Sequence, residues 1–227
     1  MLLRNDFSQF THFFWDLDGT LTRSAEGIVN SVRYALESFG IKEADDEKLK
    51  RFIGPPLVES FNVFYGLNEE QCNKAIEKYR EFYTEKGIFQ NAVYEGIPET
   101  LQKLKENGKK LYVATSKPEV FMFRILEHFN LSQYFDFAGG ADIAEARSEK
   151  HKVIEYVIKH ENLQVEQKNG KILMIGDRKH DILGARKNGV KCCAVLWGYG
   201  NQREFEEFKA DFIISKPADL VCVTCKE

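Results

Sequence analysis

The stretch FFWDLDGTLTRS, residues 13–24, runs three aromatic residues directly into two aspartates that stand one position apart, Asp16 and Asp18. A short apolar run that ends in polar residues is typical of a strand buried on both faces of a parallel sheet. Side chains two residues apart on a strand project to the same side, so these carboxylates repel each other unless a cation is present. The stretch therefore predicts a buried strand that ends in an anionic, cation-binding site.

Three further apolar runs end in threonine, in glycine and aspartate, or in glycine: KKLYVAT (109–115), KILMIGD (171–177) and VKCCAVLWG (190–198). Two more strands are expected at residues 134–140 and 210–215. Helical patterns occupy the connections, at residues 98–108, 118–130, 149–160 and 181–189. This alternation predicts an α/β fold with a doubly wound, Rossmann-like parallel sheet.

Residues 23–91 interrupt the alternation with helical patterns alone. Ser24 is the candidate N-cap of the first of these helices, and Gly40 is its candidate stop. A helical insert placed directly after the first strand divides the chain into two parts. We expect an α/β core of residues 1–22 and 92–227 and a helical cap of residues 23–91.

Bulk composition favours an ordinary soluble protein. The chain has 227 residues, of which 43% are hydrophobic, and 32 basic residues nearly balance 35 acidic ones. The basic residues are scattered, so nucleic-acid binding is not expected. No apolar run approaches the ~20 residues that span a bilayer, and the start lacks the pattern of a signal peptide. We therefore expect a cytoplasmic protein that binds no membrane.

Cysteine usage argues against a disulfide framework, because the number of cysteines is odd and no export signal is visible. One alternative is a zinc site that combines Cys192 and Cys193 with Cys222 and Cys225. Adjacent residues on a strand point to opposite faces, so Cys192 and Cys193 could hardly bind one ion together. Reduced, buried cysteines are the favoured interpretation.

Polar side chains follow several predicted strands at their carboxyl ends, where ligands bind in open parallel sheets. They are Asp16 and Asp18, Thr115 and Ser116, then Asp177 with Asp181 close behind. Magnesium favours a few carboxylate oxygens, several waters and a substrate phosphate. The pattern therefore predicts a Mg²⁺ site with Asp16 and Asp177 as anionic ligands.

Three short segments, in order along the chain, resemble motifs of the haloacid dehalogenase superfamily of phosphotransferases: WDLDGT (15–20), VATSKP (113–118) and GDRKHD (176–181). The helical insert resembles the alpha-helical cap of that family. The segment FIGPPLVESF (52–61) is similar to a cap segment of phosphoglycolate phosphatase-like members, some of which are known as 5'-nucleotidases. The resemblance implies a magnesium-dependent phosphatase that acts on a small phosphomonoester.

The resemblance also implies roles for four aspartates. Asp16 would be the nucleophile that forms an aspartyl phosphate. Asp18 would be the general acid and base, and its main-chain carbonyl would bind the metal. Asp177 would complete the metal site, and Asp181 would bind the metal through water or orient its neighbours. N-capping of the following helix is an alternative task for Asp181.

Further roles follow from the same motifs. Gly19 would let the backbone approach the phosphate, and Thr115 with the N–H of Ser116 would hold a phosphoryl oxygen. Capping of the helix near Pro118 is the alternative for Thr115. A third motif requires a lysine that neutralises charge, and Lys150 is preferred to Lys152 for this position.

Two arginines of the insert, Arg23 and Arg51, are candidate specificity residues. The alternatives are a surface ion pair for Arg23 and a place on a surface helix for Arg51.

The sequence leaves the substrate open, together with the choice between a monomer and a weak homodimer. Three rival functions remain: a phosphosugar mutase of the β-phosphoglucomutase type with the same aspartates, a haloacid dehalogenase, and a non-catalytic phosphate-binding protein.

Overall fold

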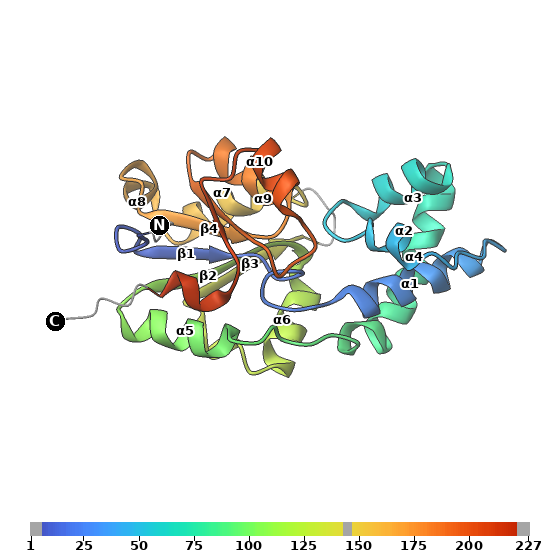
Figure 1. Ribbon diagram of the computed structural model, residues 1–227. Helices are drawn as coiled ribbons and strands as arrows, with labels where there is room; N and C mark the ends of the chain where they lie inside the picture. The colour runs from blue at the N-terminus through green and yellow to red at the C-terminus, as the bar shows by residue number, and fades with distance from the viewer. Residues whose placement is uncertain (1–5, 143–146, 222–227) are drawn as a thin grey trace. The chain divides into compact units, whose positions relative to one another are not determined.

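The computed structural model describes residues 6–142 and 147–221 (Figure 1). Contacts divide the chain into two compact units. The first, the core unit, consists of Met1–Leu21 and Val93–Glu227, and the second, the cap unit, of Thr22–Ala92. The cap unit is one residue longer at each end than the insert expected from the sequence.

The core unit contains a six-stranded sheet with the order β3-β2-β1-β4-β5-β6. Every neighbouring pair of strands is parallel. The strands are β1 His12–Trp15, β2 Lys110–Pro118, β3 Phe137–Ala141, β4 Ile172–Gly176, β5 Lys191–Val195 and β6 Phe212–Ile214. The predicted doubly wound α/β fold is therefore confirmed.

Helices cover both faces of this sheet, with α7 and α9 on one side and α5 and α6 on the other (Figure 1). Phe13, Phe14 and Trp15 of β1 are fully buried, which explains the apolar run before the aspartates. The helices are α5 Ile97–Glu106, α6 Glu119–His128, α7 Lys150–His160, α8 Gln164–Lys168, α9 Lys179–Lys187 and α10 Gln202–Glu207, with the 3-10 turns η2 Ser132–Tyr134 and η3 Pro217–Leu220.

Most element boundaries differ by a few residues from the sequence-based expectation, and two short helices were not expected. Strand β2 continues past Thr115 to Pro118, since a proline disfavours the helical conformation in the residue before it. Strand β5 ends at Val195 rather than at Gly198, and the chain turns there. The short helices α8 and α10 were not predicted, because five or six residues show little helical periodicity.

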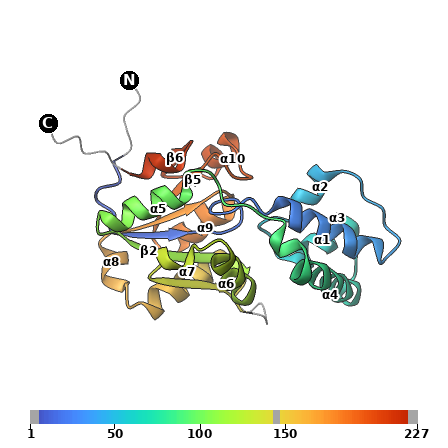
Figure 2. The same ribbon diagram turned by 90° about the horizontal axis from the view of Figure 1, so that it is seen from below.

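The cap unit is helical, as its sequence pattern indicates. It contains α1 Ala25–Glu37, α2 Asp46–Lys50, α3 Leu57–Tyr65, α4 Glu69–Glu85 and the turn η1 Gly87–Phe89. Helices α1 and α4 run side by side (Figure 2). Asn68 begins α4 with a reciprocal capping box to Gln71. Ser24 occupies the expected N-cap position of α1, but its buried hydroxyl makes no capping hydrogen bond.

The cysteines of the described residues are free and buried: Cys72, Cys192 and Cys193. Cys192 belongs to the core cluster on one face of the sheet, and its neighbour Cys193 does not. Cys222 and Cys225 lie outside the described residues. Among residues 6–142 and 147–221, no helix is both long and apolar enough to cross a membrane.

Candidate active site

Three aspartates meet at the carboxyl ends of β1 and β4. Asp16 follows β1 and donates its N–H to Ile175 O (2.9 Å), while Asp177 follows β4. Asp181 is the third residue of α9 and accepts a hydrogen bond from Arg178 N (3.0 Å), so it caps this helix from within rather than as the N-cap residue. One carboxylate oxygen from each aspartate lies within 4.8 Å of the others. The structure thus brings together side chains that lie 165 positions apart in the sequence.

Burial makes this cluster electrostatically costly. Removal from water, together with the charge of Asp181, raises the pKa of Asp16 to about 6 against the attraction of Lys150. Burial and the charges of Asp181 and Asp16 raise the pKa of Asp177 well above its ordinary value. A bound divalent cation would remove both the repulsion and the need for protons. Three clustered carboxylates therefore form a donor set that could hold a metal ion.

Lys150, the first residue of α7, is the cation nearest to this cluster in the described structure. Its Nζ lies 2.7 Å from Asp16 Oδ1 and 2.9 Å from Asp181 Oδ1, and it donates to Ala114 O at 3.1 Å. Burial lowers the pKa of Lys150, but the two carboxylates outweigh it and raise this pKa above the ordinary value. The side chain is 4% exposed.

Lys152, the alternative lysine, lies elsewhere on the same helix. Its side chain is 44% exposed, and its Nζ pairs with Glu149 on the surface at 3.0 Å. Two residues along a helix point about 200° apart, so only one of these lysines can face the sheet. The structure places Lys150, and not Lys152, beside the aspartates.

Asp177 is held by donors from two loops. Thr20 Oγ1 donates to Asp177 Oδ1 at 3.3 Å, and the N–H of Tyr199 donates to Asp177 Oδ2 at 2.7 Å. Gly19 has a φ of +81°, and a Cβ there would lie 2.2 Å from Asp177 Oδ2. Gly19 thus allows the turn after β1 to lie against Asp177. The expected approach of Gly19 to a phosphate stays a prediction.

Thr115 and Ser116 lie near the end of β2, beside the aspartates of β1. The Thr115 side chain hydrogen-bonds to Asp16, which lowers the pKa of that carboxyl. Its Oγ1 also accepts the N–H of Lys117 at 3.3 Å. Pro118, not Thr115, occupies the N-cap position of α6, so the capping alternative for Thr115 is wrong. Ser116 is half-buried.

Asp18 does not belong to the carboxylate cluster. Its Oδ2 lies 2.6 Å from Nζ of Lys117, with side-chain exposures of 16% for Asp18 and 7% for Lys117. Lys117 belongs to the segment VATSKP, but no role was predicted for it from the sequence. The available signal was its place in the sequence, because Lys117 lies only two residues after Thr115.

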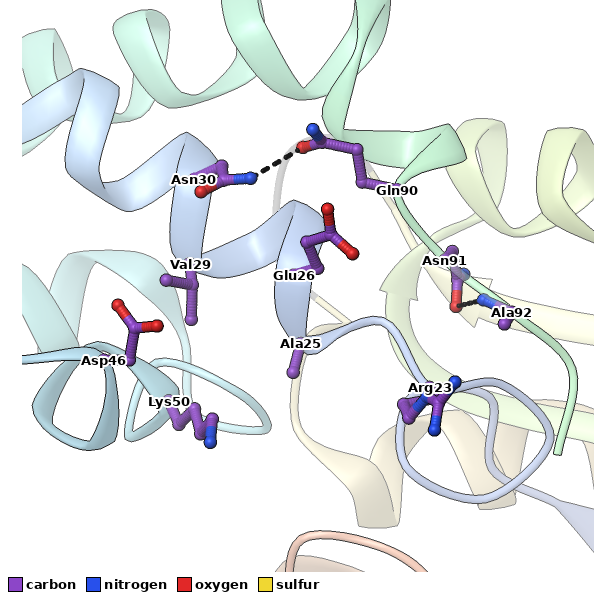
Figure 3. Close-up of a pocket in the computed structure, with 10 residues that line it drawn as sticks. All are labelled: Arg23, Ala25, Glu26, Val29, Asn30, Asp46, Lys50, Gln90, Asn91 and Ala92. Carbon is purple, nitrogen blue, oxygen red and sulfur yellow. Dashed lines mark hydrogen bonds between the residues drawn. The ribbon is translucent and has the colours of Figure 1, made fainter.

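The cap unit contains a pocket of about 330 Å³ (Figure 3). Charges of both signs line it, Arg23 and Lys50 against Glu26 and Asp46, with an Asn30 to Gln90 hydrogen bond of 3.0 Å beside them. Arg51 is not among the lining residues. It is exposed, and its guanidinium lies 4.2 Å from the centre of the Phe64 ring.

Comparisons with known proteins agree with this geometry. The family model described as "Haloacid dehalogenase-like hydrolase" matches residues 13–195. A "5'-nucleotidase" of Pseudomonas aeruginosa is 42% identical over 202 residues, which cover 89% of this chain and 90% of the relative. "Tyrosine-protein kinase PtkA" of Mycobacterium tuberculosis is 37% identical over 88% of this chain, which spans only 64% of that protein.

A solved structure extends the likeness to three dimensions. The crystal structure of a predicted phosphatase from Clostridium acetobutylicum has a TM-score of 0.87 and 42% sequence identity, covering 93% of this chain and 96% of that one. The family match spans the residues of all three motifs. The resemblance inferred from the sequence is confirmed, and the chain is an enzyme that belongs to the haloacid dehalogenase-like hydrolase family.

Proposed function

We propose that this enzyme is a magnesium-dependent phosphatase that hydrolyses a small phosphomonoester through an aspartyl phosphate on Asp16. One observation carries the proposal: a carboxylate at the end of the central strand β1 is held by a buried lysine beside two further carboxylates. Asp16 Oδ1 accepts from both Lys150 Nζ (2.7 Å) and the N–H of Leu17 (2.8 Å). These contacts fix the orientation of the proposed nucleophile.

The reaction would proceed in two displacements. In the first, a carboxylate oxygen of Asp16 attacks phosphorus, the ester P–O bond breaks, and the leaving oxygen takes a proton from Asp18. In the second, a water oxygen attacks phosphorus and gives a proton to Asp18, while the bond from phosphorus to Asp16 breaks. Inorganic phosphate leaves, and both aspartates return to their initial states.

Charge compensation is the second element of the proposal. Mg²⁺ would be held by the carboxylates of Asp16 and Asp177 and by the main-chain carbonyl of Asp18, with Asp181 binding through water or orienting Lys150. When bound, it would offset the negative charge of the phosphoryl group and the aspartates. Lys150 would contribute a further positive charge from its buried position.

Phosphate recognition would complete the core site. Thr115 and the N–H of Ser116 would hold one phosphoryl oxygen from the end of β2, and the backbone at Gly19 would approach the phosphate on the other side. The hydrogen bond from Thr115 to Asp16 supports this arrangement, since it joins the second motif to the nucleophile. Such donors stabilise charge that develops in the transition state.

The leaving group would be chosen by the cap unit, which we propose closes over the core site and excludes other water. The mixed charges around the cap pocket suit a small polar metabolite, with Arg23 as its candidate anion-binding residue. The similarity to a protein named as a 5'-nucleotidase favours nucleoside monophosphates for the first tests, followed by phosphoglycolate. We also expect a cytoplasmic protein that is a monomer or a weak homodimer.

Phosphate release from a panel of metabolites and from an aryl phosphate tests this function. We expect release with Mg²⁺, loss of release with EDTA, and recovery when Mg²⁺ is added back. Activity that survives EDTA would contradict the metal requirement. Isomerisation of a sugar phosphate that outpaces phosphate release would show a mutase instead.

A further inference from the structure

Lys117, near the end of β2, forms a partly buried ion pair with Asp18, with 2.6 Å between Nζ and Oδ2. We propose that Lys117 is a positioning residue for proton transfer: it anchors Asp18 through Oδ2 and presents Oδ1 to the leaving oxygen and then to water. The proposal rests on the phosphatase function above, because it gives Asp18 the role of general acid and base.

The backbone of β2 explains why Lys117 can reach Asp18. Strand β2 continues to Pro118, with a register shift against β3 between Ala114 and Pro118. Within this stretch the N–H of Lys117 donates to Oγ1 of Thr115, the partner of Asp16, at 3.3 Å. A Cβ at Gly140 of β3 would lie only 2.6 Å from Lys117 O, so this end of β2 packs tightly against its neighbour. The root of the lysine side chain is therefore fixed by the sheet.

The two oxygens of Asp18 have different surroundings. Oδ2 receives the ammonium of Lys117, whereas Oδ1 is buried and receives no hydrogen bond from any described residue. A buried carboxylate oxygen without a donor is costly, and a bound molecule with an exchangeable proton would satisfy it. A carboxylate with one oxygen held by an ion pair and the other without a hydrogen bond suits a group that exchanges protons with a substrate.

The metal cluster cannot take over this anchoring. The carboxylate of Asp18 is not among the three whose oxygens lie within 4.8 Å of one another. Lys150, the other buried lysine at these strand ends, contacts Asp16 and Asp181 instead. The two lysines thus hold different aspartates, the nucleophile for Lys150 and the proposed acid and base for Lys117.

A positioning role has a kinetic signature. With an aryl phosphate and Mg²⁺, we expect Lys117→Met to lower kcat at least about 10-fold and to change KM by less than about twofold, because general acid and base catalysis contributes about 10² to 10⁴-fold. Lys117→Arg should recover part of the loss. Lys110→Met, an exposed lysine of the same strand, should behave as the wild type.

A double-mutant cycle with Asp18→Asn separates positioning from direct phosphate binding. If Lys117 acts through Asp18, Lys117→Met should lower single-turnover phosphate release no further in the Asp18→Asn background. If the double variant instead loses the product of the two single-variant factors and KM is raised, Lys117 binds the substrate itself, which would overturn the proposal. If the methionine variant does not fold by circular dichroism, Lys117→Gln takes its place in the cycle.

Two other outcomes separate a failure of the positioning role from a failure of the phosphatase function. An active wild type with equally active Lys117 variants would overturn the positioning role and leave the phosphatase function intact. A wild type that releases no phosphate from any ester would overturn the function and the positioning role with it.

Discussion

Lys150 of the core unit and Lys74 of the cap unit both lie within 3 Å of a carboxylate, but their environments differ. Lys150 is 4% exposed and contacts Asp16 and Asp181, whereas Lys74 is 63% exposed and pairs with Glu70 at 2.8 Å. Exposed ion pairs contribute little to folding stability because water and salt screen them. Breaking a buried pair is costly because it leaves a buried charge without a partner. Removing the charge of Lys150 should therefore change the chemistry, whereas removing the charge of Lys74 should not.

The largest expected effect is at Lys150. We expect Lys150→Met to lower phosphate release at least about 100-fold, as does the removal of one preorganised stabilising donor in other enzymes. Lys152→Met is the matched control on the same helix and should stay within about twofold of the wild type. Steady-state release of phosphate from an aryl phosphate measures both variants, and equal losses in the two would break the contrast between buried and exposed lysines.

The second effect concerns metal and pH. The pKa of Asp16 is raised from 3.8 to about 6 in the folded chain, so the metal-free fold binds more protons than the unfolded chain between these values. The contribution of protonated Asp16 to the stability of the metal-free fold is complete below about pH 4 and is lost as pH rises through 6. At neutral pH this loss lowers the free energy of unfolding by at most about 3 kcal/mol. The raised pKa of Asp177 acts in the same direction.

Thermal melts with EDTA and with Mg²⁺ at pH 5 and pH 8 measure this effect. We expect Mg²⁺ to raise the melting temperature more at pH 8 than at pH 5, because only ionised carboxylates bind the metal. In Asp16→Asn, which removes one of the groups, the metal-free melting temperature should depend less on pH. A larger Mg²⁺ effect at pH 5 would contradict the assignment of the cluster as a cation site.

The smallest effect is expected in the cap unit. Glu70→Gln and Lys74→Met break the exposed pair on α4, and we expect each to shift the melting temperature by less than about 2 °C. Phosphate release should be unchanged in both variants. A large drop in melting temperature, or one that high salt does not reduce, would show that such surface pairs matter more than their exposure suggests.

The proximity of Asp16 and Asp177 could be predicted because it follows from regular features of the whole sheet. Apolar runs located the strands, and since parallel strands end at one edge of a sheet, Asp16 and Asp177 could be expected to lie close together. Their proximity did not depend on the exact length of any element. The three motifs likewise indicated a family that the comparisons confirm.

Local details could not be predicted in the same way. Lys117, the partner of Asp18, lies in the three residues by which β2 extends past its expected end at Thr115. Strand ends are predicted from sequence only to within a few residues, so this extension could not be foreseen. The donor from Tyr199 to Asp177 is a main-chain N–H, and any residue type except proline could supply it. Ser24 occupies the expected position before α1 but forms no cap, since capping depends on backbone geometry as well as on residue type.

Chemical trapping of the intermediate tests the central claim that Asp16 is the nucleophile. The enzyme is mixed with an aryl phosphate and Mg²⁺, quenched in the first turnover, and reduced with borohydride, which converts an aspartyl phosphate to homoserine. We predict homoserine at position 16 of the digested protein, and none in Asp16→Asn, which should stay folded and release no phosphate. Homoserine at another aspartate, or full activity in Asp16→Asn, would contradict the account.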